Sequence, residues 1–341
     1  MSRINFTNRA RDCACDSTRR VMLGAGSAVL LGWLPLVQAQ AVFPSRPLRI
    51  VVPNAAGGAA DLTARTVAQK LAVSLGQSVV IENRPGAGGV VAGELVARAE
   101  ADGHTLLLVS SGTAVSAALF KALPFDTLAD FAPVSLLATF DLAIVSAKDG
   151  RFSSLAELLT HARAYPGKLN IGTPNVGTTQ NLAAELFKAS AGIDAQVVPF
   201  NGTPAVITAL RGGQIDVAID ILGPLMGQID ARALRPLAVL GAARAPQLPQ
   251  VPAVRETGGA LGDFDVSSWN GLAVPARTPA PVIARLNADV QLALAGADVR
   301  KRLLDLNLAA RGSTPAQLAA HLAGDVKRWA GVIAAAGIAR Q

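Results

Sequence analysis

The chain has 341 residues, of which 51% are hydrophobic and 16% are charged, and its formal net charge is +7. This length is enough for two globular domains with a substantial core, and the composition excludes a disordered chain. No block of lysine or arginine stands out and only 4% of the residues are aromatic, so nucleic-acid binding is not expected.

The first 41 residues have the pattern of an export signal peptide. Five arginines precede an apolar run over 21–37, and Ala39-Gln40-Ala41 fits a small-x-small cleavage site. The run is short for a membrane span and contains three glycines and a proline, so a retained anchor is the less favoured alternative. Residues 18–23 resemble a twin-arginine signal but lack its usual phenylalanine, which leaves Sec export open. The leader carries +3 of the net charge, and the mature chain is therefore near +4.

Both cysteines, Cys13 and Cys15, lie in this leader. They precede the apolar run and so do not form a lipoprotein cleavage box. The mature chain is expected to have no disulfide and no thiolate nucleophile or ligand. An exported protein of this kind depends on its hydrophobic core for stability.

Short apolar strands alternate with helical patterns from residue 43 onward, which predicts an α/β fold with parallel sheets. In the first part, strands are expected at 48–53, 78–82 and 104–110, and helices at about 60–75 and 89–99. Residues 124–126 and 130–134 are expected to form a connecting loop, and 142–145 a strand that leads out of this first α/β unit.

A second α/β unit is predicted to begin at Arg151. Ser153 is expected to cap a helix that ends near Ala164, and Pro204 suits the first position of another helix. Strands are expected at 168–172, 196–200, within 212–220, at 236–240 and at 268–275. Helices should close the chain at 279–295, 298–306 and 314–336.

Several of these strands run into a loop rich in glycine, serine or threonine, and a helix follows the loop. The first such loop ends in Gly57-Gly58, and the others are 83–89, 109–113, 173–181 and 201–204. Free N–H groups and the positive dipole end at a helix N-terminus bind anions without any lysine or arginine. Such loops gather at the carboxyl edge of a parallel sheet, which favours an anion with more than one acceptor group. The alternative is ordinary turns whose glycines serve the backbone alone, and for Ser111 a helix N-cap is the favoured role.

No catalytic motif accompanies these loops. The three histidines, His104, His161 and His321, are not spaced as metal ligands, and no G-x-G-x-x-G or G-x-S-x-G motif is present. The carboxylates Asp61, Asp216 and Asp220 are acid–base candidates that nothing else supports. Nothing in these residues therefore supports catalysis, and no metal and no cofactor are expected.

An ordered set of motifs resembles the periplasmic solute-binding proteins of tripartite tricarboxylate transporters, also called the Bug family. It runs from Phe43 to the C-terminus, and each motif is weak alone while the ordered set is specific. The motifs are Phe43-Pro44-Ser45-Arg46-Pro47-Leu48-Arg49, Pro53 through Gly57-Gly58 to Asp61, Glu82-Asn83-Arg84-Pro85-Gly86-Ala87-Gly88-Gly89, Gly212-Gly213-Gln214-Ile215-Asp216, Leu248-Pro249 with Val251-Pro252, Trp269 with Gly271-Leu272, and Arg328-Trp329 with Ala336-Gly337-Ile338.

The resemblance implies an α/β, two-lobed periplasmic binding protein (Venus flytrap) with two doubly wound sheets joined by a hinge. The first lobe would comprise 42–142 and 263–341, and the second 143–262. The protein would capture a small carboxylate and deliver it to the membrane permease of a tripartite tricarboxylate-type transporter. A monomer is expected, because a hinged receptor must present both lobes to its partner.

The resemblance also implies where the ligand lies. Backbone N–H groups of two facing loops would hold a ligand carboxylate, partly through water, and side chains of further loops would contact the remainder. The first loop contributes Ala56, Gly57, Gly58 and Asp61, the facing loop Thr173, Gly177, Thr178 and Thr179, and the further loops Ser111, Thr113, Asn201 and Asp220.

Three departures from the family pattern bear on specificity. Gln180 stands where the family often has a histidine, Asn201 where it usually has a lysine or arginine, and Asn54-Ala55-Ala56 where Phe-x-Pro is common. The missing cation argues against a ligand with many carboxylates. A monocarboxylate, a dicarboxylate or an amino acid is therefore expected rather than citrate.

Two other classes of function remain as alternatives. A periplasmic co-sensor would present the bound carboxylate to a sensor kinase, and neighbouring genes would distinguish it from a transport receptor. A cryptic periplasmic enzyme on the same scaffold would turn its ligand over in a closed vessel.

Overall fold

The computed structural model describes residues 43–341. The predicted leader, with both cysteines, lies outside the described residues. Across the described range, no helix combines the length and apolar character needed to cross a membrane.

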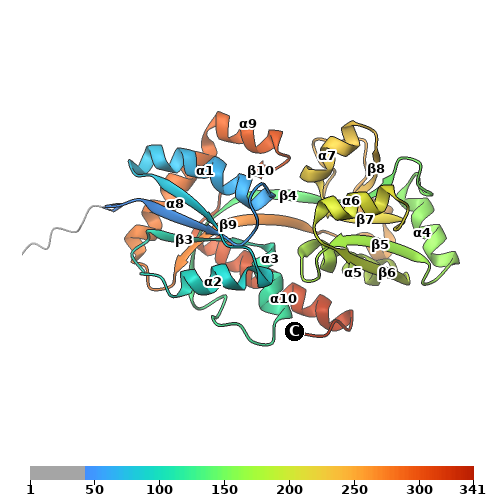
Figure 1. The fold of residues 1–341 in the computed structure, drawn as a ribbon, viewed down its shortest axis with the longest axis horizontal. Coiled ribbons are helices and arrows are strands. Elements are labelled where there is room, and N and C mark those ends of the chain that lie inside the picture. Colours follow the sequence, from blue (N-terminus) through green and yellow to red (C-terminus); the bar gives the residue numbers. More distant parts are fainter. Residues whose placement is uncertain (1–42) are drawn as a thin grey trace, which may run out of the picture. The chain divides into compact units, whose positions relative to one another are not determined.

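The strand β4 (Phe131–Ala147) is shared by two sheets. Up to Asp141 it pairs with β9 (Ser267–Pro275), and from Leu142 it pairs with β7 (Val217–Ile221). Figure 1 shows β4 extending from one group of strands and helices into the other. The two sheets therefore join at two adjacent residues of one strand.

The first sheet has the strand order β2-β1-β3-β9-β4, and β10 also pairs with β4. The strands β1, β2 and β3 are parallel, whereas β9 runs antiparallel to both β3 and β4. Its other elements are β1 (Leu48–Val52), α1 (Ala59–Leu75), β2 (Val79–Asn83), η1 (Ala87–Gly89), α2 (Val90–Ala97), β3 (Thr105–Ser110), α3 (Ser111–Leu119), α8 (Ala280–Ala295), α9 (Ala297–Asp305), β10 (Ala309–Ala310) and α10 (Pro315–Ala335).

The second sheet has the order β4-β7-β5-β6, and β8 also pairs with β4. The strands β5, β6 and β7 are parallel to one another, and β7 is antiparallel to β4. Its other elements are α4 (Leu155–Ala164), β5 (Leu169–Pro174), α5 (Thr179–Ala191), β6 (Ala195–Phe200), α6 (Thr203–Arg211), α7 (Leu222–Asp230), β8 (Leu234–Val239), η2 (Val254–Thr257) and η3 (Gly259–Leu261).

The α/β class and most predicted elements are confirmed, but the sheets are mixed rather than parallel. The expectation that 130–134 belongs to a connecting loop is wrong, because β4 begins at Phe131. Pro133 within this strand suggests a loop, since proline cannot donate to a sheet ladder. The structure accommodates it where the pairing with β9 shifts register, between Pro133 and Ser135.

Three predicted helix starts are wrong by one residue. Ser110, not Ser111, is the N-cap of α3, and Pro204 is the second residue of α6 rather than the first. The cap of α4 is Ser154, whose hydroxyl accepts a hydrogen bond from the N–H of Glu157. Ser153 instead donates its N–H and its hydroxyl to the Glu157 carboxylate, 2.8 Å each. Adjacent serines are equivalent to a sequence pattern, and backbone geometry decides which one caps.

The C-terminal helix α10 begins where the sequence predicts. The Thr314 hydroxyl accepts a hydrogen bond from the N–H of Gln317, and the Gln317 side chain accepts one from the N–H of Thr314. Pro315 follows as the first helical residue, where its missing N–H is not needed. This capping box fixes the start of the helix.

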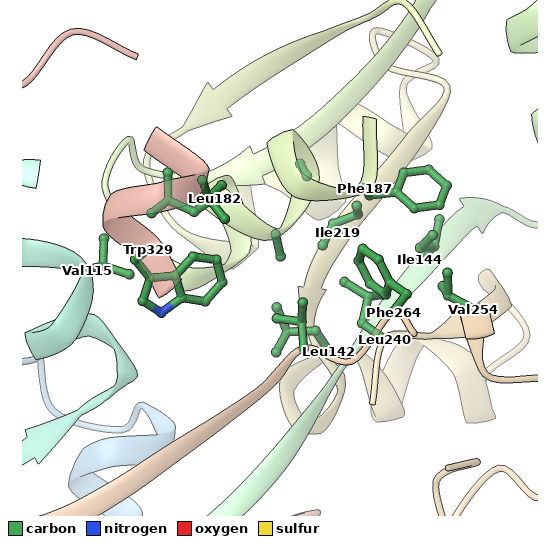
Figure 2. Packing of buried hydrophobic residues seen from close by; sticks show 14 of the residues in the cluster. Val115, Leu142, Ile144, Leu182, Phe187, Ile219, Leu240, Val254, Phe264 and Trp329 are labelled. Carbon is green, nitrogen blue, oxygen red and sulfur yellow. The ribbon is translucent and has the colours of Figure 1, made fainter. Parts of the chain in front are cut away.

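One hydrophobic cluster contains residues from both sheets and from α10. Figure 2 shows Trp329 of α10 beside Val115 of α3 and Leu182 of α5, and Phe187 and Phe264 lie in the same cluster. Trp329 is 1% exposed, which confirms the prediction that it is a packing residue. The C-terminal helix thus packs against a helix of each sheet.

Candidate ligand-binding site

The first glycine loop joins β1 to α1 and is exposed, Ala56 included. Gly57 has a φ of +83°, a left-handed conformation that favours glycine. Gly58 is the N-cap of α1, and no side chain of the described residues caps this helix. The N–H groups of its first turn therefore have no partner within the helix. They lie next to the loop, at the positive end of the helix dipole.

Asp61 braces this loop from within the first turn of α1. Its carboxylate, 2% exposed, accepts hydrogen bonds from the Gly57 N–H at 2.9 Å, from Arg65 Nε at 2.9 and 3.0 Å and from Asn83 Nδ2 at 3.0 Å. Burial raises the pKa of Asp61, but the bonds from Arg65, Gly57 and Asn83 outweigh burial and hold it below its usual value. In this structure, Asp61 and the Gly57 N–H are therefore already hydrogen-bonded to each other.

The glycine loop that was expected to face the first one joins β5 to α5. Gly177 has a φ of +77°, a conformation that favours glycine, and a Cβ added there would lie 2.8 Å from the end of the Leu119 side chain of α3. Thr178 caps α5: its hydroxyl accepts a hydrogen bond from the N–H of Asn181 at 3.2 Å. The same hydroxyl donates to the Asn175 carbonyl at 2.8 Å. This loop therefore lies against a helix of the first sheet.

Three buried hydroxyl groups meet beside this loop, and we call them the hydroxyl cluster: Ser111, Thr179 and Ser268. The Thr179 hydroxyl donates to Ser111 Oγ at 3.1 Å, and Ser111 is hydrogen-bonded to Ser268. Each residue is at most 4% exposed. The cluster links the first residues of α3 and α5 to β9. Three hydroxyls supply three protons to two bonds, so one proton remains to be donated to a further acceptor.

Two of the predicted threonines are engaged within their own loops. The fully buried Thr173 Oγ1 accepts a hydrogen bond from Asn181 Nδ2 at 3.1 Å. Thr113 Oγ1 accepts one from the Ser110 N–H at 3.0 Å. Thr113 thus holds the backbone at the start of α3, and Thr173 holds the side chain of Asn181 in the first turn of α5, so both residues shape the loops.

Asp220 lies at the carboxyl end of β7 and is completely buried. Its Oδ1 accepts hydrogen bonds from Gln180 Nε2 at 3.1 Å and from the Ile221 N–H at 2.7 Å. Its Oδ2 has no hydrogen-bond partner among the described residues. Burial raises the pKa of Asp220 to about 6, although Thr203, Gln180 and the Ile221 N–H each favour the ionised form. Asn201 is exposed in the turn that leads to Thr203.

The structure brings some of the predicted residues together and extends the set. Ser111 and Thr179 are in direct contact, and Asp220 is joined to the next residue of α5, Gln180. Ser268 carries no local signal of its role, because it is 157 residues from its partner Ser111. Arg65 follows Asp61 by four residues, a spacing from which the pair could have been predicted.

The described groups offer hydrogen-bond donors and two buried carboxylates, Asp61 and Asp220. The donors are helix N–H groups and hydroxyls, which suit carboxylate oxygens. Within 43–341, no group of three or more histidine, cysteine or acidic residues is placed to hold a metal ion.

A family model described as the tripartite tricarboxylate transporter family receptor, TctC, matches residues 63–338. The chain belongs to this family. The match confirms the resemblance that the ordered motifs predict. A solved structure described as the periplasmic binding protein BugD has a TM-score of 0.77 at 30% identity and covers 88% of this chain and 100% of that one, in agreement with the two-lobed α/β fold.

Named relatives of this TctC protein cover most of its length. The UPF0065 protein in the tcbD-tcbE intergenic region of Pseudomonas sp. (strain P51) is 37% identical over 323 residues, 95% of this chain and 96% of the relative. A structure from R. palustris, described with adipate, has a TM-score of 0.79 at 31% identity and covers 87% of this chain and 99% of that one. MatC from Rhodopseudomonas palustris, described with bound malate, has a TM-score of 0.74 at 34% identity and covers 85% and 100%.

Proposed function

We propose that this TctC protein is an exported periplasmic receptor that captures a small carboxylate and delivers it to a tripartite tricarboxylate-type permease. The carboxylate lies between the glycine loops at the N-termini of α1 and α5. Two observations support the proposal: α1 of the first sheet begins without a side-chain cap, and the glycine loop before α5 of the second sheet lies against α3 of the first. Such N–H groups bind carboxylates without a cationic side chain.

The surroundings of these loops support an anionic ligand. The hydroxyl cluster has one proton to donate, and the braced carboxylate of Asp61 is neutralised by Arg65 at 2.9 Å. The loop therefore presents no uncompensated negative charge, although its Gly57 N–H is already bonded to Asp61. That the R. palustris relatives are described with adipate and malate supports a carboxylate as the ligand.

Closure on the ligand is a hinge movement at the two points where the chain passes between the sheets. The first is the change of partner at Asp141 and Leu142 of β4. The second is near Val266, whose N–H donates to the Leu240 carbonyl at 2.8 Å just before β9. Both points lie close to the predicted lobe boundaries, which supports lobes of 42–142 with 263–341 and of 143–262. Receptors of this type close by absorbing dihedral changes at a few such residues.

Thermal unfolding of the mature protein against carboxylates, amino acids and sugars tests this function. A ligand at a hundredfold over its Kd stabilises a protein by about 2.7 kcal/mol, a readable shift in midpoint. We expect small mono- or dicarboxylates or amino acids to raise the midpoint without forming a product. A midpoint that responds to neutral sugars and to no acid would contradict the proposal.

A further inference from the structure

A hollow of about 600 Å³ opens at the edge of the second sheet that is opposite the proposed carboxylate site. It is formed by the ends of β4, α6 and α7 and by the segments that precede β7 and β8, which Figure 1 shows within one group of elements. The proposed carboxylate site lies at the carboxyl ends of the parallel strands, whereas the hollow lies where β7 begins. The five residues of β7 rise about 3.3 Å each, so about 15 Å separates the two places.

Four cationic side chains from three segments of the chain line this hollow. They are Lys148, Arg151, Arg211 and Arg232, and all four are exposed. Two acidic residues, Asp149 and Asp216, line it as well. Four cations against two acids leave an excess of two positive charges in the hollow.

The acids of the hollow do not neutralise its cations. Asp216 accepts a hydrogen bond from the N–H of Asn170 at 2.9 Å, and its one ion pair within residues 43–341 is with Arg151 at 3.9 Å. In the same range, none of Lys148, Arg211 and Arg232 forms an ion pair with an acidic side chain. A concave surface lined by charges of one sign attracts ions of the opposite sign, so this hollow favours an anion.

Arg232 is retained in a backbone conformation that favours another residue. Its φ is +56°, and it ends α7 in a motif in which the N–H of Ala233 donates to the Gln228 carbonyl at 2.8 Å. Glycine is the usual left-handed residue of such a motif, and Gly76 and Gly192 are the left-handed residues at the ends of α1 and α5. An arginine kept at this cost points to a use of its side chain.

A simpler role for both arginines is to stabilise the ends of helices. Arg211 is in the last turn of α6, and Arg232 directly follows Ala231, the C-cap of α7. Cations at these positions offset the negative end of a helix dipole. With this role alone, the arginines would stabilise the fold and the hollow would bind no anion. A binding measurement therefore separates the two explanations.

We propose that this hollow binds a phosphate-bearing anion, either free or as the headgroup of a phospholipid. Guanidinium groups match phosphate oxygens with paired hydrogen bonds, and lysine adds a point charge. A phosphate monoester carries about two negative charges at neutral pH, which balances the excess of the hollow. A volume of about 600 Å³ is in the range of small-molecule sites. The site is separate from the carboxylate site and depends on neither the carboxylate nor the permease of the proposed function.

Two binding assays on the mature protein test the two sources of phosphate. Calorimetric titration with pyrophosphate, at an ionic strength held constant with sodium chloride, tests a free phosphate compound. Co-sedimentation with phosphatidylglycerol vesicles, compared with phosphatidylcholine vesicles, tests a headgroup. We expect saturable binding in at least one assay. Binding of pyrophosphate alone would identify a free compound as the ligand, binding of vesicles alone a phospholipid headgroup, and binding of both the shared phosphate chemistry.

A pair of double variants locates the binding. Arg211→Gln with Arg232→Gly removes two cations of the hollow, and glycine at 232 suits the left-handed backbone, so this variant should fold. The matched control, Arg277→Gln with Lys327→Gln, removes two exposed cations that lie outside the hollow and form no ion pair among the described residues. The hollow variant should bind the effective probe at least about tenfold more weakly than the wild type. The control should bind it as the wild type does.

Absence of saturable binding in both assays would overturn the inference. Binding that the control variant weakens as much as the hollow variant would show a general effect of charge and would also overturn it. The rise in unfolding midpoint with a carboxylate should be the same in the wild type and both variants, because the two sites lie at opposite ends of β7. A wild type that responds to no carboxylate would contradict the proposed function and leave this inference intact.

Discussion

Ionisation of Asp220 should lower the stability of the ligand-free protein as the pH rises. The pKa of this carboxyl is about 6 in the folded protein and 3.8 as an ordinary aspartate. Between these values the folded state holds a proton that the unfolded state has released, so stability decreases as the pH rises through this window. The two-unit difference corresponds to about 3 kcal/mol in total, of which about 2 kcal/mol falls between pH 4.5 and 7.5.

Asp220→Asn removes this titration while keeping the shape of the side chain. Urea unfolding of the wild type and the variant at pH 4.5 and 7.5 measures the effect. The wild type should lose about 2 kcal/mol relative to the variant between the two pH values. Asp141, whose pKa is raised by burial and by the nearby Asp265, is common to both proteins and cancels in the comparison. Parallel stability profiles for the two proteins would refute the reasoning, and Asp216→Asn should follow the wild type.

Three further predictions concern packing, the hydroxyl cluster and charge. Ser268→Ala removes the hydrogen bond to Ser111 and should lower the free energy of unfolding by about 1 kcal/mol in urea titrations. An unchanged free energy of unfolding would show that this hydrogen bond does not stabilise the fold. Trp269→Phe should lower the free energy of unfolding in urea by about 1 kcal/mol more than Trp329→Phe. The reason is that Trp269 Nε1 donates to the Asp325 carboxylate of α10 at 2.7 Å, whereas Trp329 Nε1 has no partner among the described residues. Equal losses of stability in the two variants would contradict this. Asn201→Arg should raise the affinity for more highly charged acids in a titration series, and unchanged affinities would argue against a charge-limited site.

The sequence predicts the fold well where the signal is local. Strands such as β1 and helices such as α10 are marked by apolar periodicity and by caps within a few residues, as Thr314 with Pro315 illustrates. The first part of β4 has no such local signal. Pro133 suggests a loop, and only the pairing with β9 makes this segment a strand. Tertiary context decides such segments.

The candidate site shows the same division. Glycine loops at helix N-termini follow from the chain order, and Asp220 is marked by its place at the end of a strand. The contact of Ser268 with Ser111 and the bond from Gln180 to Asp220 are not predictable, because they join residues far apart in sequence. Nor does sequence reveal that Asp61 is bonded to the N–H of Gly57. The contacts of Ser268 and of Gln180 form only through the packing of α3, α5, β7 and β9.

Binding of an acid compared with its primary amide tests the central claim most directly, because only the charge and the acceptor oxygens change. Calorimetric titration of the mature protein with the best-bound carboxylate, and then with the matching amide, isolates the interaction of an anion with the helix N-termini. The account predicts that the acid binds and that replacing its carboxylate by an amide weakens binding by at least about tenfold. Equal affinities for acid and amide would show that helix N–H groups do not hold an anion in this protein.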